Sequence, residues 1–426
     1  VPYNYSYPFL ILHQNTNCTS TWMLFKMAAT NVSRNILTPG LASLRSYLQS
    51  ELNVLRKAPI LLISSEVGAS SSKLKPVADS CQWVKFTLGQ QFGMRTVPTT
   101  ISSAFPTKDS LEQTLELMQR TGASSIVSVG SGSAIDLAKA VATTVQVDQE
   151  RKTPLILVPT TYSGLVAAGS SHSLFLDGNE DTLVPLPHRH QQIIATADGS
   201  STYATVSTLD PQKYMENLDE DKFDVLLYAI SAILLDAGSR KSTYPSLPTL
   251  LQATIDLISL RNSPGWDQNE QLLAAIPSLT NLLYQSAGSV SYGLSDGFEE
   301  EDNRSITIAL ASSLIPTLFP EIHPISFIAS LVPGLCHYYS IQGETVTNDN
   351  EKVNDKFRTL VQQLQEQSSG RGMGPPPSLE TRDESLQGFS IPDMAVSHIQ
   401  SNQAVWKPLD VPDDVLVQVL QHSLKQ

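Results

Sequence analysis

The stretch that decides the fold is SIVSVGSGSAIDLAKAVA, residues 125–142. It begins as a β-branched run typical of a buried strand, passes through Gly130, Ser131, Gly132 and Ser133, and continues at once with a helical pattern. A strand, a glycine turn and a helix in direct succession bring backbone N–H groups and the positive end of a helix close to a phosphate. The pattern therefore predicts a phosphate-binding turn, with an ordinary tight turn of small residues as the alternative.

Short apolar segments alternate with helical segments on both sides of this turn. The predicted strands are 59–64, 94–102, 124–130 and 154–161, and the predicted helices between them are 71–93, 110–121 and 133–145. Such alternation is typical of βαβ units that form a parallel sheet with right-handed crossovers. We therefore predict a doubly wound α/β domain over residues 36–210, preceded by an N-terminal tail or extension over residues 1–35.

The strand signal disappears after Pro211, and apolar residues then recur at helical spacing. This pattern predicts a separate all-α domain over residues 211–426, with a loop or linker rich in glycine, proline and charge at 368–388. The stretches 226–235 and 305–335 are nearly uncharged, and we expect them to form inner helices.

The composition excludes several classes of partner. The 426 residues include 28 Lys and Arg against 41 Asp and Glu, a net charge of −13, so no nucleic acid partner is expected. No apolar run reaches the roughly 18 residues of a membrane span. The three cysteines, Cys18, Cys81 and Cys336, form no C-x-x-C pair, which favours a reducing, cytoplasmic location.

A second turn of small residues, VPTTYSG at 158–164, follows the next predicted strand. Its Thr160 and Thr161 stand at the carboxyl end of that strand, where open α/β sheets bind ligands. Threonine is also common in strands for reasons unrelated to ligands. Two polar turns from consecutive βα units nevertheless predict a ligand cleft more strongly than either turn alone.

Both turns resemble signature loops of the iron-containing alcohol dehydrogenase and dehydroquinate synthase-like superfamily. Residues 129–142, VGSGSAIDLAKAVA, resemble its G-G-G-S-x-x-D-x-A-K signature, with Ser131 at the second glycine. The VPTTYSG turn resembles its P-T-T-x-x-G loop, in the form found in the maleylacetate reductase-like branch. The resemblance covers about residues 36–340 and implies an N-terminal dinucleotide-binding domain.

The resemblance also implies roles for individual residues. The backbone of residues 130–133 is expected to hold the pyrophosphate of NAD or NADP, Asp136 and Lys139 to line the cofactor cleft, and Thr160 and Thr161 to touch the nucleotide.

The end of the first strand bears on the choice between the two nucleotides. Family members usually carry an acidic residue there that binds the adenosine ribose, whereas here the matching position is Ser65, with Glu66 next along the chain. A carboxylate repels a 2′-phosphate and a serine does not, so we expect NADP to be tolerated.

The family's metal ligands are only partly present. Metal-dependent members hold Fe²⁺ or Zn²⁺ with an Asp and a His four residues apart on one helix, plus two later histidines. Here Asp236 matches the aspartate, but the histidine position is Arg240, whose charged guanidinium has no lone pair to donate. Asp236 and Arg240 also have the spacing of an ordinary salt bridge on a helix.

The later ligands allow two alignments. In the preferred one, His323 matches the last ligand and the preceding ligand falls on the segment 305–314, which has no histidine. In the other, both His323 and His337 are ligands, since their separation of 14 residues equals that of the family's two later ligands. Because divalent sites need three or four ligands, we predict at most a remnant site of Asp236 and His323, and we expect no bound Fe²⁺ or Zn²⁺.

The resemblance implies an NAD(P)-dependent oxidoreductase that moves hydride between the nicotinamide and a small alcohol, carbonyl or keto acid substrate held between the domains. Without a metal, a side chain must polarise the substrate oxygen. The candidates are His323 as proton donor, Arg240 as binder of an oxyanion or carboxylate, and His337, although either histidine can instead be part of a helical core. The alternative function is a catalytically degenerate member that acts as a nucleotide-binding or scaffold protein. A homodimer would be ordinary for this family.

Overall fold

The chain is described here by a computed structural model. The described residues are 45–46, 48–49, 55, 58–65, 75–103, 105–149, 153–169, 172–177, 182–187, 203–205, 220–238, 247–263, 278–279, 282–283, 286, 306–315, 318–319, 322, 324–342, 351–367, 373–377, 394–397, 399 and 411–424. All of them belong to one compact unit, residues 34–426. The predicted tail at 1–35 lies outside the described residues.

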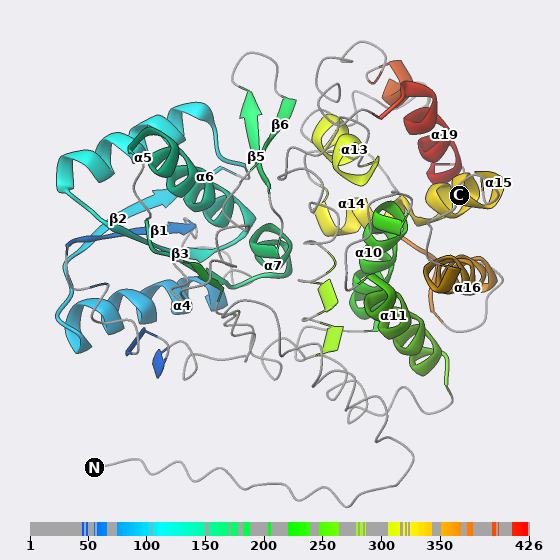
Figure 1. Cartoon of the computed structure of the whole chain (residues 1–426), viewed down its shortest axis with the longest axis horizontal. Coiled ribbons are helices and arrows are strands. Elements are labelled where there is room, and N and C mark those ends of the chain that lie inside the picture. The colour runs from blue at the N-terminus through cyan, green and yellow to red at the C-terminus, as the bar shows by residue number, and fades with distance from the viewer. Residues whose placement is uncertain are drawn as a thin grey trace, which may run out of the picture. The chain divides into compact units, whose positions relative to one another are not determined.

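A parallel five-stranded sheet forms the centre of the N-terminal half (Figure 1). Its strands have the spatial order β2-β1-β3-β4-β7 and all pair in parallel. Their bounds are β1 (Ile60–Ser65), β2 (Thr96–Ile101), β3 (Ser125–Gly130), β4 (Leu155–Pro159) and β7 (Tyr203–Thr205). The connecting helices are α4 (Lys75–Phe86), extended by a π-helical turn at Thr87–Gln91, α5 (Lys108–Thr121), α6 (Gly132–Gln149) and α7 (Tyr162–Gly169). The predicted doubly wound α/β fold is confirmed.

Local signals explain where these helices begin and end, and α5 illustrates them. Thr107 and Ser110 form a reciprocal capping box at its start, each side chain accepting the other's backbone N–H. Gly122 ends the helix in the left-handed conformation, with φ of 65°. The helix therefore ends at Thr121, where the sequence predicts its end.

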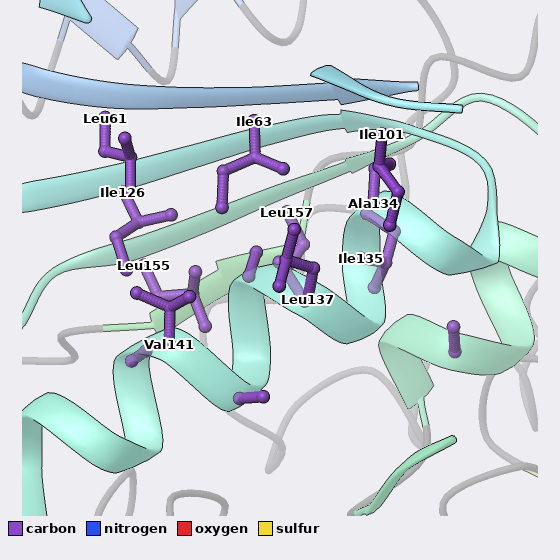
Figure 2. Packing of buried hydrophobic residues seen from close by; sticks show 14 of the residues in the cluster. Leu61, Ile63, Ile101, Ile126, Ala134, Ile135, Leu137, Val141, Leu155 and Leu157 are labelled. Carbon is purple, nitrogen blue, oxygen red and sulfur yellow. The ribbon is translucent and has the colours of Figure 1, made fainter. Parts of the chain in front are cut away.

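The sheet buries side chains on both faces, which explains its continuous apolar strands. On one face, side chains of β1, β3 and β4 pack against α6 (Figure 2). Leu61, Ile126 and Leu157 lie on this face and are fully buried. On the other face, residues of the same strands, among them Leu62 and Val127, pack against α4 and the residues that follow it.

The helix and the two strands at 162–187 carry no clear signal in the sequence. The helix α7 is short, and β5 (His172–Asp177) pairs with β6 (Thr182–Pro187) in an antiparallel hairpin separate from the main sheet. Pro185 and Pro187 weaken the strand pattern of β6, since proline cannot donate to a ladder hydrogen bond.

After β7, every described element is a helix, as the sequence predicts. These helices are α10 (Glu220–Gly238), α11 (Leu247–Arg261), α13 (Ile306–Leu314), α14 (Pro324–Ser330), α15 (Val332–Gln342), α16 (Glu351–Gln367) and α19 (Asp413–Ser423). The stretch 226–235 is buried within α10, as expected of an inner helix. No helix among the described residues is long and apolar enough to cross a membrane.

Part of the predicted linker is held by hydrogen bonds. Within 373–377, the Gly374 N–H donates to Asp224 Oδ2 at 3.0 Å, and the Tyr228 hydroxyl donates to the Gly374 carbonyl at 2.7 Å. Arg261 binds both oxygens of Asp224, through Nε at 2.8 Å and Nη2 at 3.1 Å. This segment is therefore fixed to α10 rather than free.

Because Leu157 is buried between the sheet and α6, shortening its side chain should strongly destabilise the protein. Leu157→Ala leaves a cavity under α6, and we expect it to lower the free energy of unfolding by about 2–5 kcal/mol. Urea denaturation followed by circular dichroism measures this loss. Glu112→Ala, on the exposed side of α5, is the control and should change stability by no more than about 0.5 kcal/mol. Equal midpoints for the two variants would contradict this assignment of the core.

Candidate functional site

The order of the strands places the carboxyl ends of β1 and β3 side by side in the sheet. The chain leaves β1 for β2 on one side and returns through α5 to β3 on the other side, so these two neighbours form the switch point of the sheet. Ligands of open α/β folds bind outside the carboxyl ends of the strands at such a point. In this chain those ends are Ser65 and Gly130.

The ends of β1 and β3 approach each other very closely, at Ser65 and Gly130. Gly130 has φ of +148°, and a Cβ atom on it would lie 2.3 Å from Ser65 Oγ. The Ser65 hydroxyl oxygen accepts the Ser131 N–H at 3.0 Å and lies 2.8 Å from Ser131 Oγ, which in turn lies 3.2 Å from Ser133 Oγ. These three hydroxyls, Ser65, Ser131 and Ser133, are called the serine cluster below. Only glycine fits at position 130 because both space and conformation exclude a side chain.

The helix α6 begins directly at the serine cluster. Its first residue is Gly132, and the Ser131 carbonyl accepts the Ile135 N–H at 3.3 Å, so Ser131 occupies the N-cap position. The first turn of any helix has N–H groups without intrahelical partners and a positive partial charge. An anion at the carboxyl end of β3 would meet this turn and the serine hydroxyls.

The second predicted turn packs on the first. The Thr160 N–H donates to the Gly130 carbonyl at 3.0 Å, and a Cβ atom on Gly164 would lie 2.8 Å from that same oxygen. Thr161 caps α7, with its Oγ1 accepting the Gly164 N–H at 3.1 Å. The structure thus brings together the two turns that the sequence singles out.

Asp136 and Lys139 lie buried where α6 meets α7. Lys139 Nζ is 3.4 Å from Asp136 Oδ1 and donates to the Ala167 carbonyl at 2.5 Å. Ala167 is in the last turn of α7, whose carbonyl groups attract a cation. Burial lowers the pKa of the Lys139 ammonium, while the Asp136 carboxylate acts in the opposite direction. The pair joins α6 to α7, a contact that the pattern of residues does not reveal.

The candidate metal and catalytic residues are only partly described. Arg240 and His323 lie outside the described residues. Asp236, near the end of α10, is 1% exposed, and its carboxylate accepts the backbone N–H groups of Ile306 and Thr307. The described side chains contain no group of three or more His, Cys, Asp or Glu residues placed to hold a metal.

His337 lies on α15, half-buried, beside the C-terminal helix. Its ring stacks on that of His422 in α19, with the ring centroids 3.4 Å apart and the planes inclined by 17°. His422 Nδ1 is 3.0 Å from the Gln418 carbonyl oxygen. The sequence offers no signal for this pairing because the two histidines are far apart along the chain.

The close contact at Gly130 predicts that a single methyl group disrupts the site. Gly130→Ala should destabilise the protein by about 1–3 kcal/mol through backbone strain and should weaken NADPH binding, because Ser65 and the turn must separate. Thermal unfolding and NADPH fluorescence titration measure the two effects. The matched control is Gly93→Ala, which also has a positive φ, 64°, but no atom within 4 Å of the added Cβ, and it should lose stability without losing affinity. Equal affinity in both variants would exclude Gly130 from the predicted nucleotide site.

The sequence of the part of the chain that contains both turns matches a known family model. Residues 46–173 match the family model described as iron-containing alcohol dehydrogenase, and both turns lie within the match. No curated protein matches the sequence significantly.

Solved structures share the fold at low sequence identity. A maleylacetate reductase from Rhizobium sp. strain MTP-10005 is 15% identical with a TM-score of 0.57, and the alignment covers 93% of this chain and 97% of that one. The maleylacetate reductase from Agrobacterium tumefaciens is 13% identical, with a TM-score of 0.57 and coverages of 92% and 96%. An iron-containing alcohol dehydrogenase from Thermotoga maritima is 15% identical, with a TM-score of 0.56 and coverages of 92% and 99%. The resemblance predicted from the two turns is confirmed.

Proposed function

We propose that the chain, whose residues 46–173 match the iron-containing alcohol dehydrogenase family model, is an NAD(P)-dependent oxidoreductase. The substrate would be a small alcohol, its carbonyl counterpart or a keto acid. The observation that carries the proposal is the meeting of the two turns at the β1–β3 switch point, where the Thr160 N–H binds the Gly130 carbonyl. Both turns belong to the part of the chain that matches the family model.

The residues at the switch point fit a dinucleotide. The first turn of α6, with the hydroxyls of Ser131 and Ser133, offers N–H and hydroxyl donors to a pyrophosphate without any basic surface. Thr160 and Thr161, on the adjacent turn, are the proposed contacts to the rest of the nucleotide. Bound nicotinamide would supply or accept the hydride. The buried pair of Asp136 and Lys139 supports the proposal by holding α7, and hence the second turn, against α6.

Substrate polarisation is assigned to side chains of the helical half. We propose His323 as the proton donor and Arg240 as the group that binds an oxyanion or a substrate carboxylate, with His337 as the other candidate acid. Arg240 stays cationic at any accessible pH and presents several N–H donors, which suits a developing negative charge on oxygen. The homodimer and the cytoplasmic location stay predictions of the sequence.

The uncharged Ser65 at the end of β1 predicts that the protein tolerates NADP as well as NAD. Ser65→Asp places a carboxylate at the proposed adenosine-ribose position, so NADPH affinity should fall at least about tenfold, or 1.4 kcal/mol, while NADH affinity holds or improves. Fluorescence titration of both nucleotides measures the change. Ser65→Asn, similar in size but uncharged, is the control and should show no such selectivity. Parallel losses for both nucleotides in Ser65→Asp would place Ser65 away from the ribose.

The oxidoreductase activity is tested directly. Purified protein is mixed with NADH or NADPH and a panel of aldehydes, keto acids and unsaturated keto acids, and the nicotinamide absorbance is followed with and without added Fe²⁺ or Zn²⁺. We expect oxidation of the nucleotide with at least one carbonyl class and without added metal. The Gly130→Ala variant serves as the background control. Activity that appears only with metal would overturn the metal-independent proposal.

The second candidate function is a degenerate member that binds nucleotide without turnover. The observation behind it is the contact between Asp236 and α13, because a residue at one of the family's metal-ligand positions is engaged in holding a helix. The same assay separates the two functions: nucleotide binding without oxidation of any panel member favours the degenerate protein.

A further inference from the structure

The Asp236 carboxylate is bound by the start of another helix. Asp236 Oδ1 accepts the Ile306 N–H at 3.1 Å, and Oδ2 accepts the Thr307 N–H at 3.0 Å as well as the Thr307 hydroxyl. Ile306 is the first residue of α13, a helix of nine residues. Three donors from one helix terminus therefore converge on a carboxylate that belongs to α10.

This arrangement satisfies both partners. A buried carboxylate is costly unless it is hydrogen-bonded, and Asp236 is 1% exposed. The start of a helix has N–H groups without intrahelical partners and a partial positive charge, so a carboxylate placed there is stabilising. We propose that Asp236 acts as the N-terminal cap of α13, supplied from α10, and that this structural role replaces the metal-ligand role implied by the family resemblance.

The residues at the other ligand positions agree with this replacement. Position 240 holds an arginine, whose positive charge opposes a second cation nearby. In the preferred alignment the third ligand stands 14 residues before His323, at Ala309, whose methyl group has no atom that can bind a metal. Ala309 lies on α13 itself and is 1% exposed.

The electrostatics around Asp236 point the same way. A divalent ion bound to its oxygens would stand beside the positive end of α13 and would have to compete with two backbone N–H groups and a hydroxyl. Structural and catalytic zinc sites use three or four protein ligands. The negative charge of Asp236 is therefore already balanced by hydrogen-bond donors at the start of α13. The residues present do not fit the family's metal.

The proposed cap predicts a stability defect that is independent of activity. Asp236→Ala removes the acceptor for three donors and should lower the Tm by roughly 3–8 °C. Asp355→Ala, at an exposed position of α16, is the matched control and should leave the Tm within about 1 °C. If Asp236→Ala does not fold, Thr307→Val removes only the hydroxyl donor and should give a smaller but measurable fall. An unchanged Tm in both site variants would overturn the cap.

Metal content tests the other half of the inference. The intact chain is incubated with excess Fe²⁺, without oxygen, or with Zn²⁺, then desalted and analysed by mass spectrometry of the metals. We expect no equimolar retention of either metal and no rise in Tm on adding it. Equimolar metal that is retained by the natural chain and lost in Asp236→Ala would overturn the inference. Because Tm and metal content do not involve nicotinamide, failure here is distinguishable from failure of the proposed oxidoreductase activity.

Discussion

No side chain fits at Gly130, because a Cβ atom there would lie 2.3 Å from the Ser65 hydroxyl oxygen. This close approach allows the Ser65 oxygen to accept the Ser131 N–H and allows α6 to begin directly at the end of β3. The carbonyl of the same glycine accepts the Thr160 N–H of the neighbouring turn. One residue without a side chain therefore joins three strand ends, and the proposed nucleotide site is built around it.

Buried charges perform a related task elsewhere in the chain, joining one element to another. Lys139 and Asp136 connect α6 with α7, Arg261 and Asp224 connect α11 with α10 and the 373–377 segment, and Asp236 connects α10 with α13. Only 16% of the residues are charged. In each of these places the charge meets an opposite charge or the end of a helix, which offsets the cost of removing it from water.

The sequence predicts those elements that depend on interactions between residues close together along the chain. The strands β1 to β4 and the helices between them are predictable, because apolar periodicity and capping residues such as Thr107 and Gly122 act locally. The β5–β6 hairpin is not, since β6 contains two prolines and, among the described residues, the two strands pair only with each other. The two site turns are predictable as motifs, and their meeting follows from the parallel order of β3 and β4.

What the sequence determined by itself is the alternation of elements and the two small-residue turns, because these depend on residue identity and spacing alone. The tertiary structure decided what the remaining polar groups do. Whether Asp236 faces a metal, Arg240 or another helix depends on α13, whose first residue is 70 positions away in the chain. Likewise Lys139 reaches the Ala167 carbonyl only because α6 and α7 pack together. Hydrogen bonds between distant segments are set by packing, and no local pattern in the sequence records them.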